Sequence, residues 1–596
     1  MDQENSKEKS DISSSYKHGK NPEIDAWHTA FYIENHLDYY SYKEHVASPE
    51  QVRFMVYLDE NDHYYPCSDE MFEAIINRNR SGFLQKKYNE VLQRVLELID
   101  SNIDDDREKT YLESLVIIKY KHETRDEIML PSRLEKRLLN IFYHRTQIDD
   151  PLRFKKAKRN RKVSEALESP EFKKALNHVD LTKLDDPPTT ITDIRERVEE
   201  LELKRLVALA VETPLWDSED NRKYTENDYK KIFARALTGN GVDKLFDFLG
   251  IHGKNNSRGT NISKKILWIA DETGEIIIDI TIAKYLVKLG HTVIIGVKGG
   301  PFFTKVAYTD TQEDEIISKK LEGAYFIDEK SLNKNDLVGI LRSDDHIYVI
   351  SDETQEKTNL LLTSVSYARI FKEVDGIISR GNDQKRRFFN TGFEFTQNIF
   401  NISKGDDDSV LISFKPRHPS VINFSHKDLE KKAKTIIDQM KDANENGMTV
   451  VFYSGVIGSI PGKIDEAKEI MSVFIQHLKK QFEDTFIINP SHYYEPGMDA
   501  DDLMYMWEIV QTSSYIDIWR FQTYEDIATS FQIMDKKVPP EWVGKDATYS
   551  TGCTKEMIIA QIVQKKNPEM QIIGPAKSKF MRRLDYGVGK MYDERL

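Results

Sequence analysis

The stretch Ile266–Lys305 constrains the fold more than any other part of the chain. It starts with a short apolar run, Ile266–Ala270, continues through an amphipathic segment, and reaches a second β-branched run, Thr292–Val297. A strand, a helix and a second strand in this order are typical of a βαβ unit with parallel strands. We therefore expect an α/β fold with a doubly wound, mostly parallel sheet in a three-layer α/β/α arrangement.

Charged residues and glycines follow both strands of this unit at the points where the strands end. Asp271 and Glu272 come directly after the first strand, and Lys298, Gly299 and Gly300 come directly after the second. In open α/β sheets, ligands bind at the carboxyl ends of the strands. Paired carboxylates suit a hard divalent cation, and a lysine with glycine amides suits a phosphate. A structural alternative is that Asp271 only caps the helix that follows.

The alternation of strands and helices continues on the carboxyl side of this unit. Further strands of the same sheet are expected at Gly323–Ile327, His346–Ile350, Gly376–Ser379 and Val410–Phe414. The pattern persists beyond this domain, with strands expected at Thr449–Tyr453 and Thr485–Ile488. The loop Ser454–Lys463 has the position of a phosphate loop but not the spacing of a Walker A motif, so a purely structural turn is the alternative.

The amino-terminal part of the chain has a helical pattern instead. Apolar residues recur at helical spacing in Phe83–Ile99, Val198–Val211 and Tyr229–Leu249. Together with a linker at Gly253–Gly259, these patterns predict four parts. They are a disordered tail (1–23), a helical region (24–262), the α/β domain (263–425) and a C-terminal α/β extension (426–596).

Composition limits the partners and the compartment. The chain has 596 residues, a formal net charge of −14 and no apolar run of the length that a membrane span requires. The negative charge disfavours nucleic acid and anionic membranes as partners. Cys67 and Cys553 are the only cysteines and lie far apart, which excludes a disulfide framework. With a polar N-terminus that lacks a signal-peptide pattern, these features indicate a cytoplasmic protein.

The segment Phe154–Lys162 is mostly lysine and arginine. It could be a strip that binds RNA or phosphate, or a helix face exposed to solvent. Because the chain is acidic and few aromatic residues interleave with the basic ones, we favour the solvated face.

Five short motifs occur in a fixed order along the chain. They are Asp150-Pro151 with Lys156 and Asn160; Gly239-Asn240 with Asp243; Asp271-Glu272-Thr273-Gly274-Glu275 followed by Lys298-Gly299-Gly300-Pro301; Asp375 with Arg380-Gly381-Asn382; and Lys415 in a late strand. In this order they resemble the damage-control phosphatase family, which includes proteins described as acidic-residue methyltransferase-like. The resemblance runs from Pro131 to Ser425.

The resemblance implies an enzyme that hydrolyses small phosphorylated metabolites of the sugar-phosphate type with one divalent metal (Mg, Mn, Co or Ni). It assigns the metal and the catalytic step to Asp271 and Glu272. It assigns substrate or phosphate contacts to Lys298, Gly299, Gly300, Asn240, Arg380, Asn382 and Lys415. We expect these side chains to converge on one pocket at the carboxyl edge of the sheet, with Asn240 and Asp243 near Asp271.

The chain departs from the family pattern at the metal ligands. Family members use an Asp, the adjacent Asn and a later Asp, and the corresponding residues here are Asp271, Glu272 and Lys305. A protonated lysine cannot bind a metal, so metal affinity should fall sharply unless Lys305 points away.

Two functions are consistent with this departure, and we favour the first because the other family motifs persist around the expected pocket. In the first, the protein is a metal-dependent phosphatase in which Glu272, Glu275, Asp279 or Asp310 compensates for the missing ligand, because Mg²⁺ needs only one or two carboxylates. In the second, Lys305 replaces the metal, and the protein is an inactive relative that binds a phosphorylated metabolite or scaffolds a partner. The ammonium of Lys305 should then lie within ion-pair reach of Asp271 or Glu272.

Overall fold

The computed structural model describes residues 19–59, 62–77, 82–178, 191–218, 222–251, 263–343, 346–460 and 462–585. The chain divides into two compact units, Met1–Val421 and Ile422–Leu596. Residues 1–18 of the expected tail and the expected linker at 253–259 lie outside the described residues.

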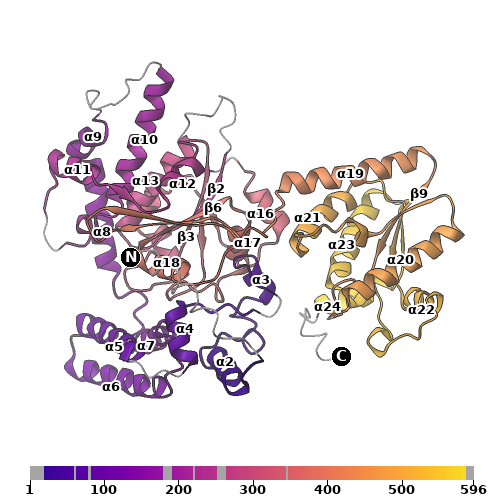
Figure 1. The fold of residues 1–596 in the computed structure, drawn as a ribbon, viewed down its shortest axis with the longest axis horizontal. Coiled ribbons are helices and arrows are strands. Elements are labelled where there is room, and N and C mark those ends of the chain that lie inside the picture. Colours follow the sequence, from indigo (N-terminus) through magenta and orange to yellow (C-terminus); the bar gives the residue numbers. More distant parts are fainter. Residues whose placement is uncertain are drawn as a thin grey trace, which may run out of the picture. The chain divides into compact units, whose positions relative to one another are not determined.

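An eight-stranded sheet forms the centre of the first unit, with the strand order β1-β8-β7-β6-β2-β3-β5-β4 (Figure 1). All neighbouring pairs are parallel except β7 and β8, which are antiparallel. The expected doubly wound, mostly parallel sheet is thus confirmed. The strands are β1 (Leu237–Thr238), β2 (Lys265–Ile269), β3 (Thr292–Val297), β4 (Tyr325–Ile327), β5 (Ile347–Ser351), β6 (Gly376–Arg380), β7 (Ile399–Lys404) and β8 (Val410–Lys415).

Each face of the sheet carries its own hydrophobic cluster, because successive side chains of a strand point to opposite faces. In β2, Leu267 and Ile269 belong to one cluster, whereas Ile266 and Trp268 belong to the other. Helices cover both faces and complete the three layers (Figure 1).

The helices of the two faces come from different parts of the chain. The first face packs against α2 (Pro22–Glu34), α3 (Pro49–Arg53), α4 (Asp69–Ile76), α5 (Gly82–Asn102), α6 (Asp106–Glu123), α7 (Pro131–Thr146), α16 (Lys334–Ile340), α17 (Val365–Glu373) and α18 (Gly381–Phe389). The second packs against α8 (Arg153–Glu168), α9 (Pro170–Leu176), α10 (Ile191–Leu209), α11 (Glu226–Phe233), α12 (Val242–Phe248), α13 (Glu275–Lys288) and α15 (Glu315–Lys320). Between β3 and α15 lies α14 (Tyr308–Glu313).

The helical pattern expected over Tyr229–Leu249 is wrong in its middle. The chain breaks between α11 and α12, pairs briefly with β8 as β1, and turns at Gly239. Gly239 has a φ of 101°, and a Cβ there would lie 2.3 Å from the carbonyl oxygen of Ile412. The close approach to β8, which sequence periodicity does not register, requires glycine at this turn.

The second unit contains a separate four-stranded parallel sheet, in the order β10-β9-β11-β12. Its strands are β9 (Thr449–Ser454), β10 (Thr485–Ile488), β11 (Ile518–Phe521) and β12 (Gln571–Ile573). Its helices are α19 (His426–Glu445), α20 (Ile464–Gln481), α21 (Ala500–Gln511), α22 (Tyr524–Ile533), α23 (Thr551–Lys566) and α24 (Lys577–Asp585). In the loop after β9, Lys463 pairs with Glu466 and Glu541, so carboxylates already hold its ammonium.

Within the described part of the chain, no helix has both the length and the apolar character that crossing a bilayer requires.

Candidate functional site

The loop after β3 folds back along the end of β2 and brings Lys305 beside Asp271. Backbone bridges pair Glu272 with Lys305 and Lys298 with Ala307. The amide of Val306 also donates to the carbonyl of Asp271 at 3.1 Å. Because backbone hydrogen bonds fix this loop, the side chain of Lys305 is held over the two carboxylates that follow β2.

Lys305 is the centre of an ion-pair cluster at the carboxyl edge of the sheet. Its ammonium lies 2.7 Å from Asp271, 2.9 Å from Glu272 and 3.6 Å from Asp383. We call these four residues the charge cluster. The contact expected of a lysine that takes the place of a metal is therefore present. Lys305 is 14% exposed and Asp383 27%, so the cluster reaches solvent on one side.

Burial and charge act against each other in this cluster. Burial disfavours the charged form of Lys305, but Asp271, Glu272 and Asp383 outweigh it and raise the pKa of the lysine. Burial also raises the pKa of Asp271, and Lys305 opposes that shift. For Glu272, burial is outweighed by Lys305 and Thr304, which hold its pKa below the ordinary value. Lys305 is therefore a cation at neutral pH.

A divalent metal does not fit among these residues as they are arranged. The ammonium of Lys305 is within hydrogen-bond distance of the carboxylate oxygens that a metal would use. Across the described residues, no group of three or more His, Cys, Asp or Glu side chains is placed to hold a metal ion. A lysine ammonium therefore occupies the space between the two carboxylates.

Two further side chains fix Glu272 in place. Arg159 of α8 donates to its carboxylate at 3.0 Å, and the hydroxyl of Thr304 donates at 2.7 Å. Arg159 also pairs with Asp217. The solvated face favoured for Phe154–Lys162 is thus wrong for part of the helix, because Lys156 and Arg159 are buried in ion pairs.

Asn160, from the same helix, holds the start of α13. Its side-chain oxygen accepts a hydrogen bond of 2.7 Å from the amide of Gly274, the N-cap residue of α13. Gly274 has a φ of 85°, and a Cβ there would lie 2.4 Å from the Cβ of Trp216. The Asp-Glu-Thr-Gly-Glu turn therefore needs a glycine at this position, because a side chain would collide with Trp216. The helix α13 begins directly after this turn.

We expect Gly274→Ala to lower the free energy of unfolding by about 2–5 kcal/mol, from backbone strain and from overpacking against Trp216. Gly290→Ala is the matched control, because Gly290 has a similar φ of 92° and a Cβ there would meet no atom within 4 Å. It should cost only about 1–2 kcal/mol. Urea-induced unfolding measures both, and equal losses would show that the contact with Trp216 is not limiting.

The start of α18 closes the cluster from the side of β6. Gly381 has a φ of 77°, and a Cβ there would lie 2.5 Å from a carboxylate oxygen of Asp271. The helix N-terminus thus lies against Asp271, where its dipole favours a negative charge. Asp383, in the first turn, pairs with Lys357 at 3.4 Å as well as with Lys305. Asn382 is exposed.

Lys298 lies on the same edge but in a neighbouring network. Its ammonium donates to Asp352 at 2.6 Å and to Thr354 at 3.2 Å. The glycines that follow it pack against the segment after β5: a Cβ on Gly299 would meet the backbone of Glu353, and one on Gly300 the side chain of Gln355. Neighbouring protein atoms explain both glycines without a ligand.

The expected phosphate contact of Arg380 is not supported, because its buried guanidinium contacts α13 instead of facing solvent. It is 1% exposed, donates to Glu275 at 2.9 Å and lies 3.4 Å from Asp279. It also donates to the carbonyl of Ala210 at 2.6 Å. Glu275 and Asp279, two of the residues considered as compensating ligands, are thus engaged by an arginine. Asp310, another of these residues, pairs with Lys156 at 2.9 Å.

The expectation that Lys415 and Asn240 lie near Asp271 is wrong. Because β8 runs antiparallel to β7, Lys415 at its end is opposite Ile399 at the start of β7. It donates to the carbonyls of Phe388 and Thr391, at the far end of α18. The amide of Asn240 pairs with the backbone of Phe414, and Asp243 is exposed in α12 beyond it. These residues belong to the opposite edge of the sheet.

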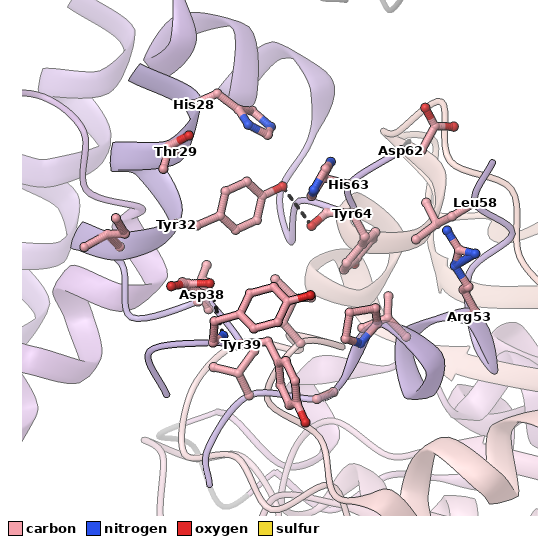
Figure 2. Close-up of a pocket in the computed structure, with 18 residues that line it drawn as sticks. His28, Thr29, Tyr32, Asp38, Tyr39, Arg53, Leu58, Asp62, His63 and Tyr64 are labelled. Carbon is pink, nitrogen blue, oxygen red and sulfur yellow. Dashed lines mark hydrogen bonds between the residues drawn. The ribbon is translucent and has the colours of Figure 1, made fainter. Parts of the chain in front are cut away.

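A cavity of about 500 Å³ lies in another part of the first unit (Figure 2). Tyr32 of α2 lines it with Tyr39 and Tyr64, and the hydroxyl of Tyr32 donates to the carbonyl of Tyr64 at 3.1 Å. None of the described residues that line it belongs to the charge cluster. The charge cluster is therefore not part of this cavity.

Residues of the site that were not predicted from the sequence include Arg159, Thr304, Lys357 and Asp383. Arg159 and Asp383 each stand next to a motif residue, Asn160 and Asn382, so adjacency was the available signal. Lys357 lies in the loop after β5, outside every motif.

The family model of the damage-control phosphatase ARMT1-like domain matches residues 83–400, which is more than half of the chain. Among solved structures, a DUF89 family protein from Pyrococcus horikoshii is similar, with 16% sequence identity and a TM-score of 0.38. That match covers 55% of this chain and 96% of the other. No curated protein matches the chain. By its motifs, its fold and the extent of the family match, the chain belongs to the damage-control phosphatase ARMT1-like domain family.

Proposed function

We propose that this protein binds a small phosphorylated metabolite, of the sugar-phosphate type, without a divalent metal, and that it does not catalyse metal-dependent hydrolysis. The observation that carries the proposal is the position of Lys305. Its ammonium occupies the point between Asp271 and Glu272 at 2.7 and 2.9 Å, and its raised pKa keeps it charged.

The ligand site would lie on the solvent side of the charge cluster. Lys305 and Lys357 both reach Asp383, at 3.6 and 3.4 Å, from two different loops. Lys357 and Asp383 are partly exposed, so solvent reaches this side of the charge cluster. A phosphate that took the place of the Asp383 carboxylate would meet two ammonium groups and the first turn of α18, which favours anions. In this view, Asp383 occupies the position of the ligand when no ligand is bound.

Calorimetric titration of the full chain with inorganic phosphate and with a hexose phosphate, in the presence of a chelator, tests this proposal. Asp383→Asn should raise the affinity by about tenfold, because it removes a competing anion and keeps the shape of the side chain. Lys357→Gln should lower the affinity by a similar factor. Unchanged affinity in both variants would contradict the proposed site.

A generic phosphatase assay separates this function from metal-dependent hydrolysis. We expect no turnover above background when Mg²⁺, Mn²⁺, Co²⁺ or Ni²⁺ is added to the native protein. Turnover that depends on added metal and is lost in Asp271→Asn would establish a metal-dependent phosphatase in place of a binding protein.

A further inference from the structure

The helical region of the first unit contains a groove that the proposed function does not use. It has a volume of about 570 Å³ and lies between α6 and α7. Its apolar residues are Leu115 and Ile118 of α6 and Ile141 of α7. Ile118 is 65% exposed.

The apolar character of α6 extends around the helix. One stripe, formed by Leu112, Val116 and Tyr120, is buried in the core. A second stripe follows the spacing i, i+4 and i+7 with Tyr111, Leu115 and Ile118, and its two outer members are 51% and 65% exposed. A helix that is apolar on two sides is normally covered on both. Among the described residues, nothing covers the outer stripe of α6 to the extent that the core covers the inner one.

The rim of the groove is basic. Lys119 and His122 of α6 and Arg137, His144 and Arg145 of α7 line it. The residues from α7 recur at i, i+7 and i+8, so they lie along one face of that helix.

No carboxylate is among the described residues that line the groove. Glu123, buried beneath the rim, pairs with Lys119 and with Arg137 and partly neutralises them. Arg145 forms no ion pair with any described residue, which leaves an exposed positive charge at the mouth of the groove.

We propose that the groove between α6 and α7 is a docking site for an acidic amphipathic helix of a partner protein. Apolar anchors at i, i+3 or i+4 and i+7 of such a helix would cover Leu115, Ile118 and Ile141, as in other helix-in-groove complexes. Its flanking carboxylates would face Arg145 and Lys119.

Charge distinguishes this occupant from an anionic membrane. The chain as a whole carries a net charge of −14, which opposes approach to a large anionic surface. A short acidic helix meets mainly the local positive rim, because charges beyond about 8–10 Å are screened at physiological salt.

A displayed library of helical peptides about four turns long, selected on the full native chain, tests the proposal. Counter-selection uses the double variant Ile118→Glu, Arg145→Glu. Both positions are exposed, so the fold should tolerate the changes. We expect the enriched peptides to combine carboxylates with apolar residues at helical spacing. They should bind the native chain about tenfold or more tightly than the double variant, and more weakly as salt is raised.

The matched control is the double variant Ile562→Glu, Lys565→Glu on α23, which changes an isoleucine that is 49% exposed and a nearby lysine in the second unit. It should bind the selected peptides like the native chain. Enriched peptides that lack carboxylates, or that bind both double variants equally, would overturn the proposal. So would binding to vesicles of anionic phospholipid that depends on Arg145 when no peptide does, which would identify a membrane as the occupant.

Discussion

Replacing Arg380 with methionine is expected to lower the free energy of unfolding by about 3–5 kcal/mol near pH 8. Arg380 is fully buried and is the cation that Glu275 and Asp279 share. Methionine keeps much of the volume but leaves two buried carboxylates without a positive charge. Breaking a buried ion pair from one side costs far more than removing a surface pair, because the remaining charge stays desolvated. Urea-induced unfolding of the full chain measures the loss.

Arg222→Met is the matched control for this variant. Arg222 also pairs with an aspartate, Asp228, but it is 65% exposed. Exposed pairs contribute about 0–1 kcal/mol, so the control should unfold almost like the native chain. A loss of similar size in both variants would mean that burial of the Arg380 cluster contributes little.

The difference between Arg380→Met and the native chain should depend on pH. Burial raises the pKa of Glu275 to about 7 and that of Asp279 to about 6, against ordinary values of 4.5 and 3.8, although Arg380 lowers both. Between the ordinary pKa and the raised pKa of each group, the folded state holds more protons than the unfolded state. The contribution of these two groups to stability therefore falls as pH rises from about 4 to about 7. Without Arg380 both pKa values rise further. The stability of the variant should then keep falling above about pH 7 and approach that of the native chain near pH 4–5.

The βαβ reasoning predicted the central strands because buried parallel strands are continuous β-branched runs between helices. β2, β3 and β5 follow that pattern closely. β7 does not, since Asn401 and Ser403 interrupt its apolar residues, and it was missed. Because β7 was not predicted, the direction of the next strand, β8, was predicted wrongly. With β7 in place, the turn at Gly405–Asp408 joins two adjacent strands as a hairpin, and β8 must run antiparallel. Lys415 was therefore assigned to the wrong edge of the sheet.

The parts of the site that could be predicted are those set by strand ends. Asp271, Glu272 and Lys298 follow β2 and β3, and all three lie at the carboxyl edge, as expected from parallel strands. Arg380 also ends a strand, but whether it faces solvent or α13 depends on the helices packed beneath the edge. Because the acids that hold it stand more than a hundred residues earlier in the chain, no local pattern in the sequence contains that information.

The change from Lys305 to aspartate is expected to increase the affinity of the chain for Mn²⁺ on the order of 100-fold or more. The substitution removes an ammonium that lies 2.7 Å from Asp271 and 2.9 Å from Glu272, and it adds a carboxylate at the same point. Three carboxylates, with Asp383 close by, then face one another without a cation, and a divalent metal relieves their repulsion. Isothermal titration calorimetry of the native chain and the variant measures the change.

Lys305→Met separates the two effects, because it removes the positive charge without adding a ligand. If Lys305 acts as a substitute for the metal, affinity for Mn²⁺ should rise from the native chain to the methionine variant and again to the aspartate variant. Added Mn²⁺ should also restore more stability to the aspartate variant than to the methionine variant, since a ligand that binds only the folded state stabilises it in proportion to its affinity. Tight binding of Mn²⁺ by the native chain, unchanged in Lys305→Asp, would show that the metal binds elsewhere and that the ammonium of Lys305 does not stand in its place.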